Sequence, residues 1–337
     1  MARILVTGGA GYIGSHTVRH LLDADHDVVV LDDLSAGHPA AVPPKVPLVV
    51  ATTADRGAVG AVLAEHRPDA VIHFAGSIEA GESMTDPQRF YANNVVGALG
   101  LVDALVAWAP IPVVFSSTAA VYGEPGRVPI DEDVAKAPTN VYGETKLAFE
   151  RILAAYDRAY GLRSISLRYF NACGARADGT IGPDHRMKTH LLTMAMLTAL
   201  GQREAVHVLG TDYPTPDGTG IRDYIHVDDL ASAHVLALRS LFDGSPSTAY
   251  NVGVGRGFSV QEVLDSADRV VGHPIPRVVG ERRAGDPAQL VADSSKIQRE
   301  LGWRPQYTEL DAIVATAWRW HSTHPDGYRD GARAGAA

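Results

Sequence analysis

The sequence predicts an α/β protein with a doubly wound parallel sheet and a second, smaller α/β part. Three observations predict this class. A short apolar strand near the N-terminus runs directly into a glycine-rich turn and a helix. Strand and helix patterns then alternate over the first half of the chain, which is typical of parallel sheets with helices on both faces. The 337 residues are enough for two domains.

The first strand, turn and helix have the spacing of a dinucleotide-binding unit. Residues 3–7 form an apolar, β-branched run, and residues 15–23 carry apolar side chains at helical spacing. Between them, Gly8, Gly11 and Gly14 lie three apart. In such units the first glycine permits a tight turn, the second admits a pyrophosphate, and the third lets the helix pack on the strand. This pattern predicts a Rossmann domain, with phosphates at the helix N-terminus.

Asp32 closes the second expected strand, residues 27–31. It follows the glycine loop by about 20 residues, where an acid binds the ribose 2′-OH of a dinucleotide. A carboxylate there repels a 2′-phosphate, so the sequence favours NAD over NADP. A glycine-rich turn without a ligand is the weaker alternative.

Further strand and helix patterns extend the sheet. The expected strands are 46–51, 69–74, 111–116 and 163–169, and the expected helices are 57–66, 87–108 and one that begins near Tyr142. Ligands of such sheets bind beyond the carboxyl ends of the strands. The loops after Thr7, Asp32, Phe74 and Ser116 are therefore expected to line one crevice.

Tyr142 and Lys146 lie four positions apart, on one face of their expected helix. A nearby ammonium favours the phenolate, so we expect Lys146 to lower the pKa of Tyr142 from about 10. Tyr142 would then act as a base toward a sugar or alcohol hydroxyl. Thr118, in the hydroxyl-rich run after the fifth strand, would supply a hydrogen bond. The alternative is a surface helix with an incidental tyrosine and lysine.

The second half is expected to add a smaller substrate domain after an irregular stretch, residues 175–188. Expected elements are a helix over 189–201, strands over 206–209, 222–227 and 250–253, a helix capped by Asp228 that runs to Leu238, and a helix from Ser259. The predicted domains are 1–174 for the Rossmann domain, with 222–255 returning to it; 175–221 and 256–330 for the substrate domain; and 331–337 for a flexible tail. The chain is expected to fray from Gly327 onward.

Composition narrows the function classes. The net charge of −9 argues against nonspecific binding to nucleic acid or acidic membranes. No apolar run is expected to reach the roughly 18 residues of a membrane span, and no signal peptide is recognised, so a cytoplasmic location is expected. Cys173 is the single cysteine, which excludes an internal disulfide. His16 and His20 share a helix face but lack a third ligand, so no metal site is expected.

Several motifs, in order along almost the whole chain, resemble the extended short-chain dehydrogenase/reductase family and, within it, the sugar-nucleotide 4-epimerases. The motifs are residues 7–14, 73–76, 93–95, 116–123, 142–146, 168–171, 210–226, 282–286 and 301–303. The stretch 210–226 is specific to this subgroup rather than to Rossmann folds at large.

The resemblance implies NAD-dependent 4-epimerisation of a UDP-hexose, such as UDP-glucose and UDP-galactose, through transient oxidation at C4. It makes Tyr142 the base, Thr118 its hydroxyl partner and Lys146 the residue that holds the nicotinamide ribose. NAD is regenerated in each cycle. The resemblance also implies a homodimer, for which the helices over 87–108 and 141–160 are candidates.

The resemblance assigns binding residues as well. The cofactor set is Gly8, Gly11, Tyr12, Ile13, Gly14, Asp32, Phe74, Ala75, Gly76, Asn94, Ser116, Tyr142, Lys146 and Tyr169. The substrate set is Thr118, Asn171, His190, Leu191, Arg222, Arg283, Asp286 and Leu290. The two arginines would clamp the diphosphate, and Asp286 would bind the uridine ribose. Leu290 falls where the family often has a bulky tyrosine, which predicts room for N-acetyl sugars.

Three other functions remain as alternatives. A nucleotide-sugar 4,6-dehydratase would have an Asp-Glu pair after Thr118, where this chain has Ala119 and Ala120. Another UDP-sugar epimerase fits the same motifs, and the physiological sugar stays open. A non-catalytic NAD-sensing protein would be expected to lack the tyrosine or the lysine. Two departures from the family stand out: Thr53 replaces an acid near adenine, and Glu79 is an unexpected acid.

Overall fold

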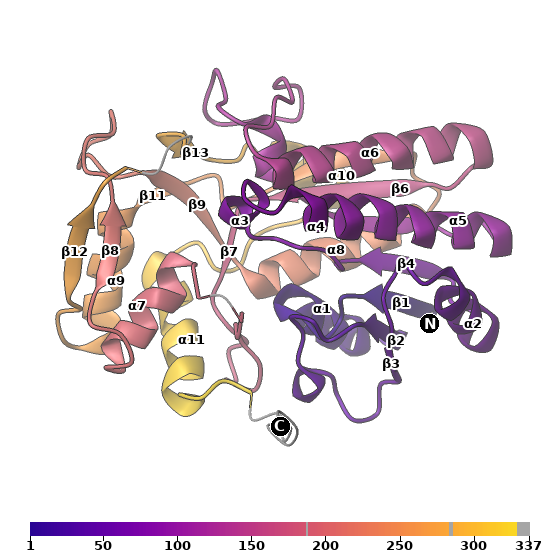
Figure 1. Ribbon diagram of the computed structural model, residues 1–337, viewed down its shortest axis with the longest axis horizontal. Helices are drawn as coiled ribbons and strands as arrows, with labels where there is room; N and C mark the ends of the chain where they lie inside the picture. Colours follow the sequence, from indigo (N-terminus) through magenta and orange to yellow (C-terminus); the bar gives the residue numbers. More distant parts are fainter. Residues whose placement is uncertain (187, 283–285, 329–337) are drawn as a thin grey trace.

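The computed structural model describes residues 1–186, 188–282 and 286–328. Its centre is a seven-stranded sheet with the order β10-β6-β5-β4-β1-β2-β3 (Figure 1). Every neighbouring pair in this sheet is parallel, which confirms the doubly wound arrangement. Its strands are β1 (Arg3–Thr7), β2 (Asp27–Asp32), β3 (Leu48–Val50), β4 (Ala70–His73), β5 (Val113–Thr118), β6 (Ser164–Tyr169) and β10 (Thr248–Val252).

Helices cover both faces of this sheet and bury two apolar clusters. One cluster joins the sheet to α1 (Tyr12–Asp23), α8 (Val227–Phe242) and α10 (Ser295–Leu301). The other joins it to α2 (Arg56–His66), α5 (Ala98–Trp108) and α6 (Val141–Tyr160). Strands buried on both faces need apolar side chains in both directions, which explains their continuous apolar runs.

The predicted helix over residues 87–108 is continuous but not uniform. It consists of α4 (Pro87–Tyr91), a π-helical segment η2 (Ala92–Gly97) and α5. It has 22 residues, and an 18-residue window within it has a mean hydropathy of 1.4, so it is long and apolar enough to cross a membrane and the expectation that no segment reaches that length was wrong. Leu101, Val102 and Leu105 are fully buried beside the sheet, as in the core helix of a globular protein.

A second part lies beside the carboxyl edge of the main sheet, at the left of Figure 1. Its strands β7 (Asn171–Cys173), β9 (Ile221–His226), β11 (Gly257–Ser259) and β13 (Gln289–Leu290) form one small sheet, and β8 (Val206–Leu209) pairs with β12 (Arg277–Gly280). The helices α7 (Leu191–Ala199), α9 (Val260–Val271) and α11 (Leu310–Thr323) share a third apolar cluster with these strands. The short helical turns are η1 (Pro39–Ala41), α3 (Ala80–Ser83) and η3 (Ala119–Tyr122).

Residues 222–255 were expected to return as a whole to the Rossmann domain, but only part of this segment does so. Strand β9 belongs to the small sheet, and only α8 and β10 return. Helix α8 begins at Val227 and runs to Phe242, with His226 rather than Asp228 as its N-cap. The Nδ1 atom of His226 accepts the Asp228 N–H at 3.1 Å, so an imidazole does the capping that a carboxylate was expected to do.

The chain is docked, not frayed, at Gly327 and Tyr328. The Tyr328 N–H donates to the Asp184 carboxylate at 2.9 Å, and its ring lies 4.8 Å from that of Trp320. The expected fraying from Gly327 was therefore wrong for these two residues. The predicted tail, 331–337, lies outside the described residues.

Candidate active site

A cavity of about 310 Å³ runs along the carboxyl edge of the main sheet, lined by the loops after β1 to β6 and by the segment before α7. The expected crevice is therefore present. The predicted site residues that line it are Gly8, Gly11, Tyr12, Ile13, Gly14, Asp32, Phe74, Ala75, Gly76, Ser116, Thr118, Tyr142, Tyr169, Asn171 and His190.

The glycine loop forms one end of the cavity. Gly8 has a φ of +73°, and a Cβ there would lie 2.6 Å from the backbone N of Ala75. A Cβ on Gly14 would lie 2.2 Å from the Gly8 carbonyl oxygen, so neither position tolerates a side chain. Gly11 is the N-cap of α1 and offers no side-chain cap, which leaves the first-turn N–H groups available to an anion. This cradle fits the pyrophosphate of a dinucleotide.

Asp32 lies at the end of β2 and is only 6% exposed. Its carboxylate accepts the backbone N–H groups of Ala10 and Leu34, each at 2.9 Å. Burial raises the pKa of this carboxyl, and the two N–H donors act in the opposite direction. The bonds fix the carboxylate at the cavity wall, and its remaining lone pairs can accept hydrogen bonds from a ribose.

Helix α6 carries Tyr142 to the other end of the cavity. The Asn140 side chain caps this helix by accepting the Gly143 N–H at 2.8 Å, and the Tyr142 N–H donates to Ser83 Oγ at 3.0 Å. The Thr118 side chain, at the end of β5, is near enough to the Tyr142 phenol to act on its pKa. The two side chains predicted to act together therefore lie close together.

Lys146 lies one turn further along α6, where it is buried and is not among the residues that line the cavity. Its Nζ donates to the Ser116 carbonyl at 3.0 Å and lies 5.9 Å from the centroid of the Tyr142 ring. A Cβ built on Gly76 would approach this Nζ to 3.5 Å, so the ammonium lies just behind the loop after β4. An ammonium here can reach a ligand held between Tyr142 and Gly76.

Burial governs the electrostatics of this pair. It raises the pKa of Tyr142 to about 12, against the lowering effect of the Thr118 side chain. It lowers the pKa of Lys146 to about 8. The expectation that the ammonium lowers the tyrosine pKa was wrong for the protein by itself, because burial removes hydration from both groups and Lys146 is not among the groups that shift the Tyr142 pKa.

Three predicted cofactor residues, Asn94, Ser116 and Tyr169, differ in whether they line the cavity. Asn94 is buried, and its amide accepts the Ser77 N–H at 2.7 Å and donates to Thr145 Oγ1 at 3.0 Å. It supports the loop after β4, while its neighbour Asn93 lines the cavity. Ser116 and Tyr169 do line the cavity, and their hydroxyls are hydrogen-bonded to each other.

Three predicted substrate residues, Asn171, Arg222 and Leu290, lie on the small sheet. Asn171 pairs with Tyr224 in the β7–β9 register, and Leu290 pairs with Arg222 in the β13–β9 register. Arg222 donates through Nη1 to the Ile221 carbonyl at 2.8 Å. Leu290 packs against the apolar cluster that contains Phe170, a cavity residue.

Of the other substrate predictions, His190 and Leu191 lie at the start of α7, and Asp286 lies before β13. His190 is the N-cap of α7 and lines the cavity, and Leu191 is the first residue of that helix. Arg222, Asp286 and Leu290 are described but are not among the residues that line the cavity. Arg283 lies outside the described residues.

Several cavity residues were not predicted. They are Leu31, Asp33, Ser35, Ala36, Gly37, Ala51, Thr52, Thr53, Ile78, Asn93, Phe170, Ala172 and His185. Most follow a strand end directly, so the rule that ligands bind beyond the strands already pointed to them. His185 is different, because it comes from the irregular segment and stacks on His190 at 4.6 Å, a contact with no local signal.

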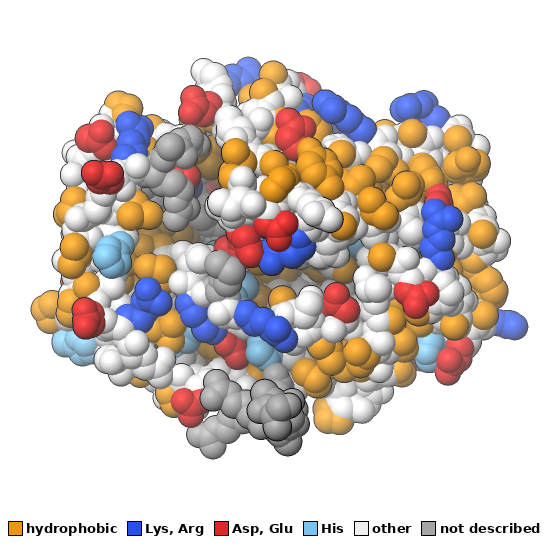
Figure 2. Space-filling view, in the orientation of Figure 1, with side chains coloured by type: hydrophobic (Ala, Val, Ile, Leu, Met, Phe, Trp, Pro, Cys, Tyr) orange, Lys and Arg blue, Asp and Glu red, His pale blue; other side chains and the backbone are white. Residues whose placement is uncertain are grey.

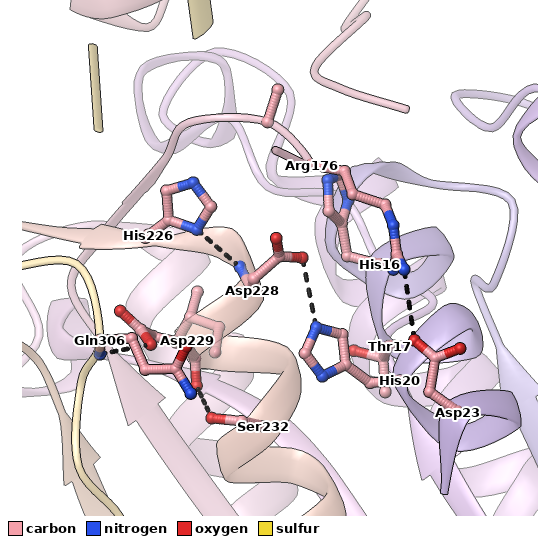
Figure 3. A network of polar contacts seen from close by, with 12 residues as sticks. His16, Thr17, His20, Asp23, Arg176, His226, Asp228, Asp229, Ser232 and Gln306 are labelled. Atoms are coloured by element: carbon pink, nitrogen blue, oxygen red, sulfur yellow. Dashed lines mark hydrogen bonds and ion pairs between the residues drawn. The ribbon is translucent and has the colours of Figure 1, made fainter. Parts of the chain in front are cut away.

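The histidines of α1 serve packing and polar contacts. His16 is buried, with Nδ1 2.8 Å from the Tyr12 carbonyl oxygen, and His20 Nε2 lies 3.3 Å from Asp228 Oδ1. Figure 3 shows both side chains on the side of α1 that meets Asp228 and His226. Within residues 1–186, 188–282 and 286–328, no three potential ligands come together in a way that could hold a metal ion.

Comparisons with known proteins agree on one family. Residues 4–253 match the model of the NAD dependent epimerase/dehydratase family. The chain is 48% identical over 327 residues to the UDP-glucose 4-epimerase of Lacticaseibacillus casei. The matched residues cover 97% of this chain and 99% of that protein.

Two solved structures are similar over almost the full length. One is the UDP-glucose 4-epimerase from Brucella ovis in complex with NAD, with a TM-score of 0.92, 46% identity and coverage of 94% of this chain and 98% of that chain. The other is that from Bifidobacterium longum in complex with NAD⁺ and UDP, with a TM-score of 0.91, 37% identity and coverage of 97% and 100%.

Proposed function

Because the chain belongs to the NAD dependent epimerase/dehydratase family, we propose that it is an isomerase that interconverts the C4 epimers of a UDP-hexose, with NAD as a bound catalyst. One observation carries the proposal. A single cavity has a glycine cradle and Asp32 at one end, and the hydroxyls of Tyr142 and Thr118 at the other. Such a cavity can hold a dinucleotide and a sugar hydroxyl side by side.

The proposed cofactor contacts follow the shape of the cavity. The N-terminus of α1 binds the pyrophosphate, Asp32 binds the adenosine ribose, and Lys146 binds the nicotinamide ribose. When bound, NAD accepts the hydride from C4 and later returns it. Arg222 and Arg283 are proposed to neutralise the diphosphate of the substrate, and Asp286 to bind its uridine ribose.

Tyr142 is the proposed base. It takes the O4 proton while the C4–H bond breaks, and Thr118 holds the same oxygen by a hydrogen bond. The 4-keto sugar then turns in the pocket, and Tyr142 returns the proton after hydride has reached the other face. With a pKa lowered to about 8, Lys146 is still mainly protonated at neutral pH and can stabilise the phenolate.

A product assay tests this proposal and separates it from the alternatives. Purified protein incubated with UDP-glucose, UDP-galactose, their N-acetyl forms and a UDP-hexuronate is expected to yield 4-epimers of at least UDP-glucose and UDP-galactose, without added reductant. A 4-keto-6-deoxy product would identify a dehydratase instead. The absence of any product, with NAD bound, would favour the non-catalytic alternative.

Asp32→Ala is expected to weaken NAD binding more than NADP binding. The carboxylate contributes a hydrogen bond only to a free 2′-OH, and its loss also removes the charge that repels a 2′-phosphate. Dissociation constants of both cofactors, measured by fluorescence titration, check the prediction. Asp27→Ala, at the start of the same strand and not among the residues that line the cavity, is the matched control. Equal weakening of both cofactors by Asp32→Ala would mean that the acid is structural.

Leu290→Tyr is expected to depress turnover of UDP-N-acetylglucosamine selectively and to spare UDP-glucose. Leucine is shorter than tyrosine, so the wild-type pocket would have space for the N-acetyl group on that side. Steady-state kinetics on both sugars check this, with Gln289→Tyr as a control for a one-residue shift. Equal losses on both sugars would make Leu290 a packing residue, and a wild type inactive on the N-acetyl sugar would contradict the prediction directly.

We further propose a cytoplasmic homodimer whose interface is built from the segment 87–108 and α6. Large apolar side chains are exposed there, namely Tyr91, Val96, Trp108 and Tyr160. On the face in Figure 2, basic side chains are interspersed with acidic and apolar ones. This mixed surface and the net charge of −9 favour a small nucleotide-sugar ligand over a nucleic-acid partner. A single monomeric species at micromolar concentration in sedimentation velocity would contradict the dimer.

A further inference from the structure

Helix α6 is tied to the end of β5 at three successive turns. Tyr142, Lys146 and Glu150 are spaced by four residues and therefore share one face of the helix. Tyr142 lies near enough to Thr118 for that side chain to act on its pKa, and Lys146 donates to the Ser116 carbonyl at 3.0 Å. The residue between these two strand positions, Ser117, contacts the third turn. The catalytic pair is thus one end of a longer connection between helix and strand.

Glu150 makes that third connection through a buried ion pair. Its Oε1 accepts the Ser117 hydroxyl at 2.5 Å and Nε of Arg168 at 2.9 Å, and its Oε2 accepts Nη2 of Arg168 at 2.5 Å. The side chains of Arg168 and Glu150 are only 7% and 9% exposed. Ser117 and Arg168 are register partners in the β5–β6 pair, so both side chains point to the same face of the sheet, toward α6.

The connection continues behind Thr118. Arg168 Nη1 donates to the Tyr122 hydroxyl at 3.0 Å, and that hydroxyl donates to Asn251 Oδ1 at 2.7 Å. Tyr122 belongs to η3, the turn that directly follows Thr118, and Asn251 belongs to β10. One chain of hydrogen bonds therefore holds α6, β5, β6, η3 and β10 in a fixed relation.

A contribution to folding stability does not by itself explain why this buried ion pair and its hydrogen bonds are present. A buried ion pair often contributes no more to folding than well-packed apolar side chains of similar volume, because desolvation offsets the attraction. Its directional bonds do fix how α6 is rotated and how far it is shifted along β5. Both movements would change the distance from Tyr142 to Thr118, and small displacements of a catalytic group have large effects on rate.

We propose that Glu150 and Ser117 are positioning residues that keep the Tyr142 hydroxyl in register with Thr118. This inference rests on the proposed function of Tyr142 and names the residues through which the fold controls it. Loosening the connection lets the Tyr142 hydroxyl move away from Thr118. Because Thr118 lowers the pKa of the phenol, this movement shifts the deprotonation of Tyr142 to higher pH.

Two variants test the proposal. Ser117→Ala removes the bond from the strand to the helix and leaves the ion pair, and Glu150→Gln keeps the size of the side chain but removes its charge. Both are expected to lower kcat by roughly tenfold, the scale of a small misplacement. Bound NAD and KM should stay near the wild-type values, and the acid limb of the kcat–pH profile should move upward.

Asp268→Asn is the matched control, because it breaks a comparable contact far from this helix, between Asp268 and Arg277. All rates are expressed per folded protein, measured by circular dichroism. If both variants keep the wild-type kcat and pH profile, as Asp268→Asn should, the proposal is overturned. A fall in kcat that merely follows a loss of bound NAD overturns it as well. A wild type without epimerase activity would instead refute the proposed function.

Discussion

Tyr142→Phe is expected to lower turnover by about a hundredfold or more, the usual scale for the loss of a general base. Phenylalanine keeps the ring in its pocket but cannot accept the O4 proton. The fold and the bound NAD should remain, because the substitution removes only the phenol hydroxyl. Initial rates with UDP-galactose, together with the absorbance of released cofactor, check both parts.

Tyr156→Phe is the matched control for this substitution. Tyr156 lies on the same helix, and its hydroxyl is bonded to Asp103 rather than directed to the cavity. The control should keep turnover within about a factor of two, since surface changes are usually small. Turnover of Tyr142→Phe close to that of Tyr156→Phe would remove Tyr142 from its role as base.

Lowering the pH from 7 to 5.5 is expected to reduce the free energy of unfolding by several kcal/mol, because histidines are buried in their neutral form. Five are almost inaccessible to solvent: His16, His73, His226, His234 and His321. Burial lowers the pKa of His73 to about 3 and of the other four to about 4. Asp228 faces His16 and His226 (Figure 3) and favours their protonated forms, but burial outweighs it.

The direction follows from proton uptake. In the unfolded chain these histidines titrate near 6.5, so between about 6.5 and 4 the unfolded state binds more protons and stability falls as the pH falls. At pH 5.5 each of these histidines lowers the free energy of unfolding by about 1 kcal/mol relative to pH 7. Asp223 acts in the opposite direction, because burial raises its pKa to about 6, and so do Asp32, Glu132 and Asp229, whose pKa values burial also raises; these four carboxyls offset part of the loss.

Urea denaturation at the two pH values measures this effect. The urea midpoint of the wild type should be lower at pH 5.5 than at pH 7. The midpoint of His234→Gln should fall by less between the two pH values, since one titrating group is gone. His273→Gln is the control, because His273 is exposed. Equal midpoints at pH 7 and 5.5 would show that the histidines are not held neutral in the folded protein.

The features that the sequence alone determined are those set by short-range patterns. The period of apolar residues located β1, α1 and β8, and the spacing of glycines located the cavity-lining loop where a Cβ on Gly8 or Gly14 would collide with the backbone. Asp32 was found because an acid at the end of a second strand has a fixed place in this fold. Each signal involves residues close in the chain, so no knowledge of packing was needed.

Tertiary structure decided the features that depend on partners far apart in the chain. His226 caps α8, Tyr328 docks on Trp320, and β9 joins β7 rather than the main sheet, although each local pattern permitted another outcome. The same holds for Tyr142, whose pKa follows burial rather than the neighbouring lysine. Neighbours in sequence reveal which groups can interact, but only the folded chain decides how much water they lose, and desolvation is what determines the charge of a buried group.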